Sequence, residues 1–165
     1  MSLDIALVRV DNRLIHGQIL EAWVPFIKAA CIVVADDMIA GDLFRAMVIR
    51  IAVPRDVEVI VSGVEDFARK YPYRTGQGKK TLVLFSSISD AVKAFQAGFK
   101  FAKLNLGNVH DVQGEAGRRQ CSSCVFLSDV DICDLRNLIN TGGVQVELRR
   151  VPQEAPVDAR DVVPI

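Results

Sequence analysis

Short apolar runs alternate along the chain with segments whose apolar residues recur at helical spacing. The continuous runs predict strands over residues 4–10, 31–35, 57–61, 81–85, 103–106, near 120–126 and over 144–149. The periodic segments predict helices near 17–30 and over 41–52, 62–71, 87–98 and 128–141. Because strand and helix alternate, we expect one α/β domain over residues 1–165, with an open, mostly parallel sheet of about six to seven strands and helices on both faces.

Several local signals refine these boundaries. Pro25 should kink or shorten the first helix, because proline lacks a backbone N–H. The segments 62–65 and 87–90 have the form of capping boxes, and each predicts a helix start. In the segment 41–52, one helical face carries Leu43, Phe44, Met47, Val48 and Ile51. The loop 107–119 is glycine-rich, polar and longer than a simple connection.

The composition excludes several classes of function. Half of the residues are hydrophobic, about a quarter are charged, and 20 basic residues balance 20 acidic ones. A net charge of zero argues against a broad electrostatic grip on nucleic acid or anionic lipid, although it allows a local positive pocket. The N-terminal segment has an early acid and too short an apolar run for a signal peptide, and no run is long enough to span a membrane. We therefore expect a cytoplasmic protein.

Cys121 and Cys124 form a CxxC pair, which suggests metal or redox chemistry. No second CxxC or HxxxH completes a zinc site, and the segment CSSCVFL resembles a strand rather than a helix start. Cys31 and Cys133 are most simply packing residues. We therefore expect no metal site at these cysteines.

The candidate chemistry lies in the loop after the first strand, where Asp11, Arg13 and His16 precede a helix start. A neutral imidazole has a lone pair free to attack phosphorus, and a guanidinium presents paired donors to phosphate oxygens. Asp11 could hold the ring in one tautomer, and the helix N-terminus would favour an anion. From residue types alone, however, a histidine after a strand is more often a loop or packing residue.

Polar residues also follow the other predicted strands, at the edge of the sheet where α/β proteins place their sites. They are Asp36 and Asp37, Ser62, Ser86 and Ser87, and then Asn105, Gly107, Asn108 and His110. A receiver-type aspartate is missing, since Ser62 stands in its place. Nucleotide-binding loops and the serine-hydrolase elbow are absent too, and no further ligands support a metal between His16 and His110.

The segment RVDNRLIHGQ, residues 9–18, closely resembles the active-site segment of the IIB component of the bacterial phosphoenolpyruvate-dependent sugar phosphotransferase system, in its mannose/fructose/sorbose family. Residues 32–37, 105–110, 117–120 and 144–156 resemble later segments of the same family, in the same order. The chain departs from the family at Pro25, at Cys121 and Cys124, and in the tail 159–165.

The resemblance implies a phosphotransferase in which His16 takes a phosphoryl group from a IIA phosphohistidine and passes it to a sugar held by membrane subunits IIC and IID. It implies that Arg13 binds phosphate oxygens, Asp11 orients the ring, and Asn12, Gly17 and Gln18 shape the loop or donate hydrogen bonds. The loop should then lie at the surface, and the transfer should need no metal or organic cofactor. The protein would associate peripherally with the inner face of the membrane through the transporter subunits, and a homo-oligomer is compatible with this role.

Two alternatives remain open, along with one further expectation about docking. The chain could be an orphan or regulatory IIB-like module that senses phosphorylation without serving a transporter. It could also be a plain α/β nucleotide-binding protein. For the transport role, we expect a basic rim of Arg9, Arg118 and Arg119 to help dock the IIA surface.

Overall fold

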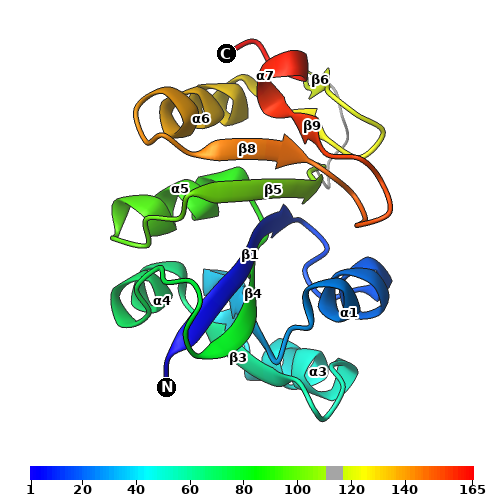
Figure 1. Cartoon of the computed structure of the whole chain (residues 1–165), viewed down its shortest axis with the longest axis vertical. Helices are drawn as coiled ribbons and strands as arrows, with labels where there is room; N and C mark the ends of the chain where they lie inside the picture. The colour runs from blue at the N-terminus through cyan, green and yellow to red at the C-terminus, as the bar shows by residue number, and fades with distance from the viewer. Residues whose placement is uncertain (111–116) are drawn as a thin grey trace.

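The computed structural model describes residues 1–110 and 117–165, and its centre is a sheet of seven strands (Figure 1). The strand order is β3-β2-β4-β1-β5-β8-β9, and all neighbours are parallel except the last pair, β8 and β9. The strands are β1 (Leu3–Asp11), β2 (Cys31–Ala35), β3 (Glu58–Ser62), β4 (Lys79–Phe85), β5 (Lys103–Asn108), β8 (Gln145–Leu148) and β9 (Val157–Asp158). The predicted open, mostly parallel α/β sheet is confirmed.

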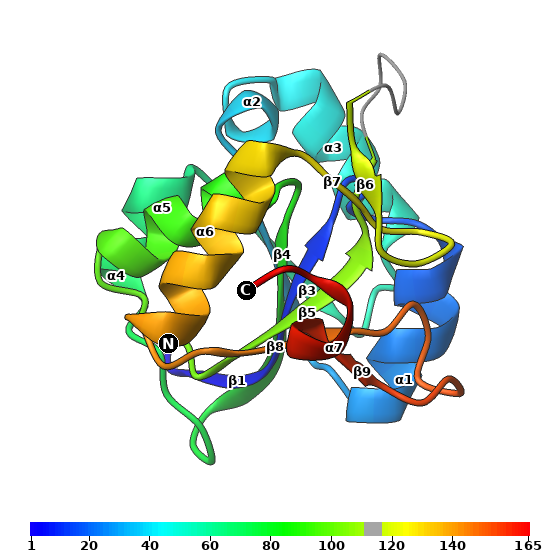
Figure 2. The ribbon, with the colours of Figure 1, turned by 90° about the horizontal axis from the view of Figure 1, so that it is seen from above.

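Helices cover both faces of this sheet, as the alternating pattern predicts. One face carries the π-helix η1 (Gln18–Trp23), α1 (Val24–Ile27) and α3 (Leu43–Ala52), with the short α2 (Asp37–Ala40) before α3. The other carries α4 (Val64–Lys70), α5 (Ile88–Gln96) and α6 (Asp129–Asn140), which lie side by side in Figures 1 and 2. The last helix, α7 (Ala159–Val162), packs near β8 and β9.

Two hydrophobic cores lie on the two faces, because successive residues of a strand point to opposite sides. In β2, Cys31 and Val33 belong to the core under α4, α5 and α6, while Ile32 and Val34 belong to the core under η1, α1 and α3. All five residues of β2 are buried. This explains why an uninterrupted apolar run, rather than an alternating one, marks the strand.

The strand order reverses between β1 and β4. The chain leaves β1 toward β2 and β3 at one edge, returns to β4, and then proceeds past β1 to β5 and β8. Ligand sites of open α/β sheets lie at such a reversal, beyond the carboxyl ends of the strands. The loop that contains His16 starts at the carboxyl end of β1 and therefore lies at this position.

Helix starts agree only partly with the predicted capping boxes. Ser87 accepts a hydrogen bond from the Asp90 backbone N–H, and at α6 Ser128 and Asp131 form a complete capping box. At α4, however, the cap is not Ser62: the Asp37 side chain accepts a hydrogen bond from the Val64 N–H at 2.8 Å. The predicted helix start is therefore confirmed at Val64, but the capping box at 62–65 was wrong because a carboxylate from a distant segment supplies the acceptor.

The segment near 120–126 is not a strand of the main sheet. Two short strands, β6 (Arg119–Gln120) and β7 (Phe126–Leu127), pair antiparallel in a separate ribbon, with Cys121 to Val125 in the turn between them. The seventh strand of the main sheet instead comes from the tail, as β9. Part of the predicted loop 107–119, residues 111–116, lies outside the described residues.

Pro25 lies at the start of α1, where η1 ends. The Val24 N–H donates to the Ile19 carbonyl, five residues back, so the wider π-turn comes just before proline interrupts the backbone hydrogen bonds. The chain then leaves the helix through Lys28, which adopts a left-handed conformation. Among the helices that the structure describes, none has the length and apolar character needed to cross a membrane.

Candidate functional site

The loop after β1 is held in shape by Asp11. Its Oδ1 atom accepts a hydrogen bond from the Arg13 backbone N–H at 3.0 Å, and its backbone carbonyl accepts one from the Leu14 N–H at 3.0 Å. This turn forces Leu14 into the left-handed region at φ 55°. Such a conformation costs a non-glycine residue about 1 kcal/mol or more, which burial of the Leu14 side chain in the core under η1 helps to offset.

His16 points back toward the strand end. Its Nε2 atom lies 2.8 Å from Asp11 Oδ2, and the side chain is 7% exposed. The loop itself reaches the surface, since Arg13 and Gly17 are exposed. The second ring nitrogen, Nδ1, has no hydrogen-bond partner among residues 1–110 and 117–165. The expected surface loop is therefore present, but its histidine ring is nearly covered.

Arg9 is the main partner of Asp11, and it is fully buried. Its guanidinium donates to Asp11 Oδ2 (3.1 Å from Nη2), to Asn105 Oδ1 at 2.6 Å, and to the backbone carbonyls of Arg149 and Arg150 at 2.9 and 3.0 Å. The expectation that Arg9 belongs to a surface rim for docking was wrong. Its charge is used inside the protein, where a buried cation needs a full set of acceptors.

A glycine leaves the space that this guanidinium needs. A Cβ atom on Gly107 would lie 1.9 Å from Arg9 Nη2. Any larger residue at 107 would therefore have to expel a cation that four acceptor groups hold in place. The indole of Trp23 covers the same guanidinium, with its ring centre 5.2 Å from the Arg9 Cζ atom.

Asn108 links Asp11 to the helix that follows the loop. Its Nδ2 atom donates to Asp11 Oδ2 at 2.9 Å and to Gln18 Oε1 at 3.0 Å. The Ile19 and Leu20 N–H groups donate to the His16 carbonyl, so the first helical turn begins at the histidine. Strand β5 and helix η1 are thus joined around one carboxylate.

These contacts keep the Asp11 carboxylate ionised. Burial alone would raise the pKa of Asp11, but the hydrogen bond from His16, the charge of Arg9 and the hydrogen bond from Asn108 outweigh it and hold that pKa below its usual value. Burial lowers the pKa of Arg9, and Asp11 acts against that effect. An ionised carboxylate can only accept, so Nε2 must carry the proton and a neutral His16 ring keeps its lone pair on Nδ1.

Arg13 and Asn12 lie on the outer side of the loop. The Arg13 guanidinium makes no hydrogen bond or ion pair with any residue that the structure describes, which leaves its donors available. The Asn12 Nδ2 atom lies 3.5 Å from the His110 carbonyl, at the end of β5. Both residues line a cavity of about 300 Å³ between the loop and α3.

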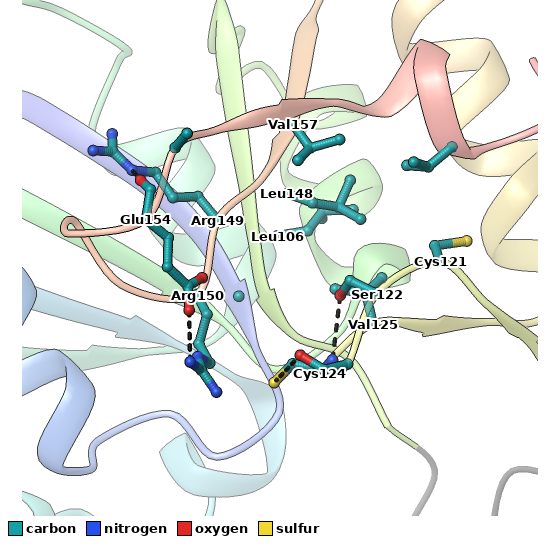
Figure 3. Close-up of a pocket in the computed structure, with 14 residues that line it drawn as sticks. Leu106, Cys121, Ser122, Cys124, Val125, Leu148, Arg149, Arg150, Glu154 and Val157 are labelled. Atoms are coloured by element: carbon teal, nitrogen blue, oxygen red, sulfur yellow. Dashed lines mark hydrogen bonds and ion pairs between the residues drawn. The ribbon is translucent and has the colours of Figure 1, made fainter.

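A second, smaller cavity lies on the inner side of the network (Figure 3). It measures about 150 Å³ and is bounded by the turn 121–125 and the segment 149–155, with Leu106 and Leu148 between them. Arg150 pairs with Glu154 at 2.6 Å, and the Arg149 guanidinium donates to the carbonyls of Pro152 and Glu154. These contacts hold the two backbone carbonyls that accept from Arg9.

Cys121 takes no part in this network, whereas the Cys124 thiol lies beside it and interacts with the Arg150 guanidinium. Cys121 and Cys124 are free thiols and point in different directions in Figure 3. Burial raises the pKa of Cys121 and makes it a poorer nucleophile, while in β2 burial raises the pKa of Cys31 to about 11. Within 1–110 and 117–165, no group of three or more His, Cys, Asp or Glu residues is arranged to hold a metal ion.

The other polar strand ends form a separate cluster. Asp36 caps α2 through the Ile39 N–H, and Asp37 pairs with Lys93 at 2.7 Å besides capping α4. The Ser86 hydroxyl donates to Asp90. These residues bond to one another and to helix ends, so the carboxylates that resemble a receiver pair have structural roles.

Sequence reasoning brought Asp11, Asn12, Arg13, His16, Gly17 and Gln18 to one loop, and the structure places them together there. It missed the roles of Arg9, Asn105 and Gly107. One signal was available: Arg9 interrupts an apolar strand (LVRVD), and a charge inside a covered strand needs a buried partner.

Comparisons with known proteins agree with this geometry. The family model described as "PTS system sorbose subfamily IIB component" matches residues 5–164. The fructose-specific EIIB component of Bacillus subtilis is 33% identical over 94% of this chain and 93% of its own length. The chain also spans about half of the mannose-specific EIIAB component of Escherichia coli, with 28% identity over 96% of the chain and 48% of that protein.

Solved structures show the same fold. The IIBSor domain of the sorbose permease from Klebsiella pneumoniae superposes with a TM-score of 0.81 and 28% identity, over 96% of this chain and 94% of that one. The manxB structure from Thermoanaerobacter tengcongensis gives a TM-score of 0.85 and 29% identity over 97% and 95% of the two chains. None of these relatives supports the regulatory alternative. The chain therefore belongs to the sorbose-subfamily IIB components of the phosphotransferase system, the phosphocarriers that pass phosphoryl groups to sugars during transport.

Proposed function

We propose that His16 carries the phosphoryl group, and that it does so on Nδ1. The observation that supports this most directly is the contact between His16 Nε2 and Asp11 Oδ2 at 2.8 Å, which leaves Nδ1 as the ring nitrogen with a free lone pair. The donor is a phosphohistidine of a IIA protein or domain. The acceptor is a sugar held by the membrane subunits IIC and IID.

Loading requires the loop to expose Nδ1, which is buried in this structure. In this step, the Nδ1 lone pair then attacks the phosphorus atom of the donor phosphohistidine. The donor P–N bond breaks, and its electron pair returns to the donor imidazole. The loaded His16 ring then bears the phosphoryl group on Nδ1 and the proton on Nε2, so the ring is cationic. Asp11, buried and ionised, stabilises that cation, as a carboxylate does for an imidazolium in a catalytic triad.

In the unloading step, a sugar hydroxyl oxygen forms the new P–O bond. The P–N bond to His16 breaks, its electron pair returns to Nδ1, and the hydroxyl proton leaves to solvent or to a base of the membrane subunits. Negative charge spreads over the phosphoryl oxygens in both steps, so positioning and cationic donors supply most of the acceleration. The exposed Arg13 is the candidate donor to these oxygens, while Asn12, Gly17 and Gln18 keep the loop in shape.

The role also implies a location. A carrier between a IIA protein and IIC and IID subunits works at the cytoplasmic face of the membrane and associates with it through those subunits. Neither a nucleic acid nor a metal or organic cofactor takes part in this scheme. A net charge of zero is consistent with such a role, since the protein does not have to bind an extended anionic surface.

The two histidines of the chain give a matched test. Incubated with phosphoenolpyruvate, the general carrier proteins and a IIA protein, the wild type and His110→Ala should take up one phosphoryl group, and His16→Ala none. Mass spectrometry under alkaline conditions, where phosphohistidine survives, locates the label, and phosphorus NMR distinguishes the two ring nitrogens. Label that persists in His16→Ala, or that lies on Nε2, would contradict the proposal.

A further inference from the structure

Helix α3 turns its apolar side toward solvent. Leu43 is 84% exposed, Phe44 is 74% exposed and Ile51 is 77% exposed. At about 100° per residue these three share one stripe with Met47 and Val48, which are also exposed. Only Ala46 of this helix is buried. The five exposed residues, Leu43, Phe44, Met47, Val48 and Ile51, are called here the α3 apolar face.

The α3 apolar face is continuous with the His16 loop. The cavity of about 300 Å³ beside the loop is lined on one side by residues 12–15 and on the other by Phe44, Arg45, Val48 and Ile49. Ile15, in its lining, is the residue directly before His16. A protein that brings its own reactive group to His16 would therefore also cover the first turns of α3.

The charged residues that line the cavity are arginines, while Asp42, directly before α3, caps the helix through the Arg45 backbone N–H. Arg13 lines the cavity from the loop, and Arg45 lines it from α3. Arg45 and Arg50 border the apolar stripe, and the residues of α3 itself, 43–52, include neither aspartate nor glutamate. Such a surface fits a partner with apolar side chains at the centre of its contact and carboxylates or a phosphate around them.

We propose that the α3 apolar face is the docking surface for the IIA protein that loads His16. This inference rests on the proposed function, because it takes His16 as the site of exchange. The donor arrives with a phosphohistidine, whose negative charge complements Arg13 and Arg45. Large exposed apolar patches next to a reactive loop mark protein contacts, and aromatic and methionine side chains are the usual anchors there.

The charges disfavour two other occupants. The cytoplasmic loops of membrane subunits carry an excess of lysine and arginine, which would repel Arg45 and Arg50. A symmetric pairing of two copies through this face would bring the same arginines toward each other and would cover the loop that must exchange phosphate. Both occupants nevertheless give distinct results in the test below.

The test compares two phosphoryl donors on variants that keep the loop intact. Phe44→Ser and Met47→Ser alter exposed residues of the α3 apolar face, while Val130→Ser alters an equally apolar residue, 67% exposed, on α6 at the opposite face of the sheet. With phosphorylated IIA as the donor, kcat/KM should fall about tenfold or more for Phe44→Ser and Met47→Ser, and stay unchanged for Val130→Ser. With phosphoramidate, a small donor that needs no docking surface, all three should label His16 at the wild-type rate.

Each other result overturns the inference in a recognisable way. Unchanged transfer from IIA removes the docking role, and an equal loss with both donors means that the substitutions disturb the loop. A loss confined to sugar phosphorylation by membranes with IIC and IID assigns the face to those subunits. A change from dimer to monomer in sedimentation assigns it to a second copy. If His16 takes no label from either donor, the proposed function fails, and titration of unphosphorylated IIA against wild type and Phe44→Ser still decides whether the face binds it.

Discussion

Asp11 holds together more of the site than any other residue, because it is contacted from three separate elements. His16, Asn108 and Arg9 all meet its Oδ2 atom, and the Arg13 backbone meets Oδ1. Each contact stabilises the ionised carboxylate, which in turn decides which nitrogen of His16 keeps its proton. At this scale, the chemistry of the histidine is set by a residue that never needs to touch the phosphate.

Arg13 should act on transfer and not on folding. Its side chain is exposed and has no bonded partner in the part of the chain that the structure describes, so Arg13→Ala should leave the melting temperature within about a degree of wild type. The transfer rate from phosphorylated IIA should fall by about two to three orders of magnitude, comparable to the loss of one oxyanion donor. Stopped-flow or quenched-flow labelling measures the rate.

Arg160→Ala, an exposed arginine on α7, is the control for a general loss of positive charge. It should leave the rate unchanged. If Arg13→Ala transfers phosphate as fast as Arg160→Ala, Arg13 is not the clamp on the phosphoryl oxygens.

At the scale of elements, strand β5 provides both hydrogen-bonding side chains for β1 and the space that the Arg9 side chain of β1 occupies. Asn105 and Asn108 donate to or accept from the network, and between them Gly107 leaves space for the Arg9 guanidinium. Only backbone without a side chain fits there. In the pairing of β1 with β5, Arg9 lies opposite Asn105. This register requires a glycine at position 107, because the Arg9 guanidinium occupies the space of its side chain.

Gly107→Ala should therefore be strongly destabilising. The added methyl group would lie 1.9 Å from Arg9 Nη2 and expel the cation or leave Asp11 buried without it, which costs about 3 to 5 kcal/mol for a broken buried pair. Urea denaturation measures the loss. Gly41→Ala is the matched control, since its nearest new contact is 3.4 Å away and it should change stability by less than about 1 kcal/mol. Equal stability of the two variants would show that the Arg9 guanidinium can adopt another buried position without loss of stability.

The elements that the sequence predicts well are those with local causes. The apolar runs of β2 and β4 and the Ser87 cap of α5 need only their own residues and burial. The cap of α4 comes from Asp37, which is distant in sequence. The exposure of the apolar face of α3 depends on how the helix packs on the sheet. Neither feature could be predicted from local sequence. In the same way, His16 and Asp11 are close in sequence, whereas Arg9 meets carbonyls about 140 positions away.

On the scale of the whole molecule, segments from the first and the last parts of the chain meet at the site. The Trp23 indole donates to the Arg150 carbonyl at 3.0 Å, and the Arg149 guanidinium lies over the rings of Trp23 and Phe26. The tail then returns as β9 beside β8. The reversal of strand order brings β1 between β4 and β5, so this packing converges on the strand that ends at Asp11.

Global stability should respond to acid through Asp11. Its pKa is lower in the folded protein than in the unfolded chain, so its contribution is complete above the unfolded pKa near 4 and is lost as pH falls through the folded value. Asp11→Asn should lower the free energy of unfolding at pH 7 by about 3 to 5 kcal/mol, because Arg9 loses its counter-charge. Urea denaturation from pH 7 to pH 3 gives the free energy of unfolding of both proteins. The gap between the two free energies should narrow below pH 4. A constant gap across that range would rule out the lowered pKa.

The four acceptor groups of Arg9 are not all made at the same time. Asp11 is synthesised with the first strand and Asn105 much later, while the carbonyls of residues 149 and 150 follow about 140 positions after Arg9. In a nascent chain without residues 149 and 150, the Arg9 guanidinium lacks two of its four acceptor groups. Asp11, the partner of His16, is then bonded to an arginine that is not yet held in place. We therefore expect the His16 loop to reach its final geometry only after residues 149 and 150 have been synthesised.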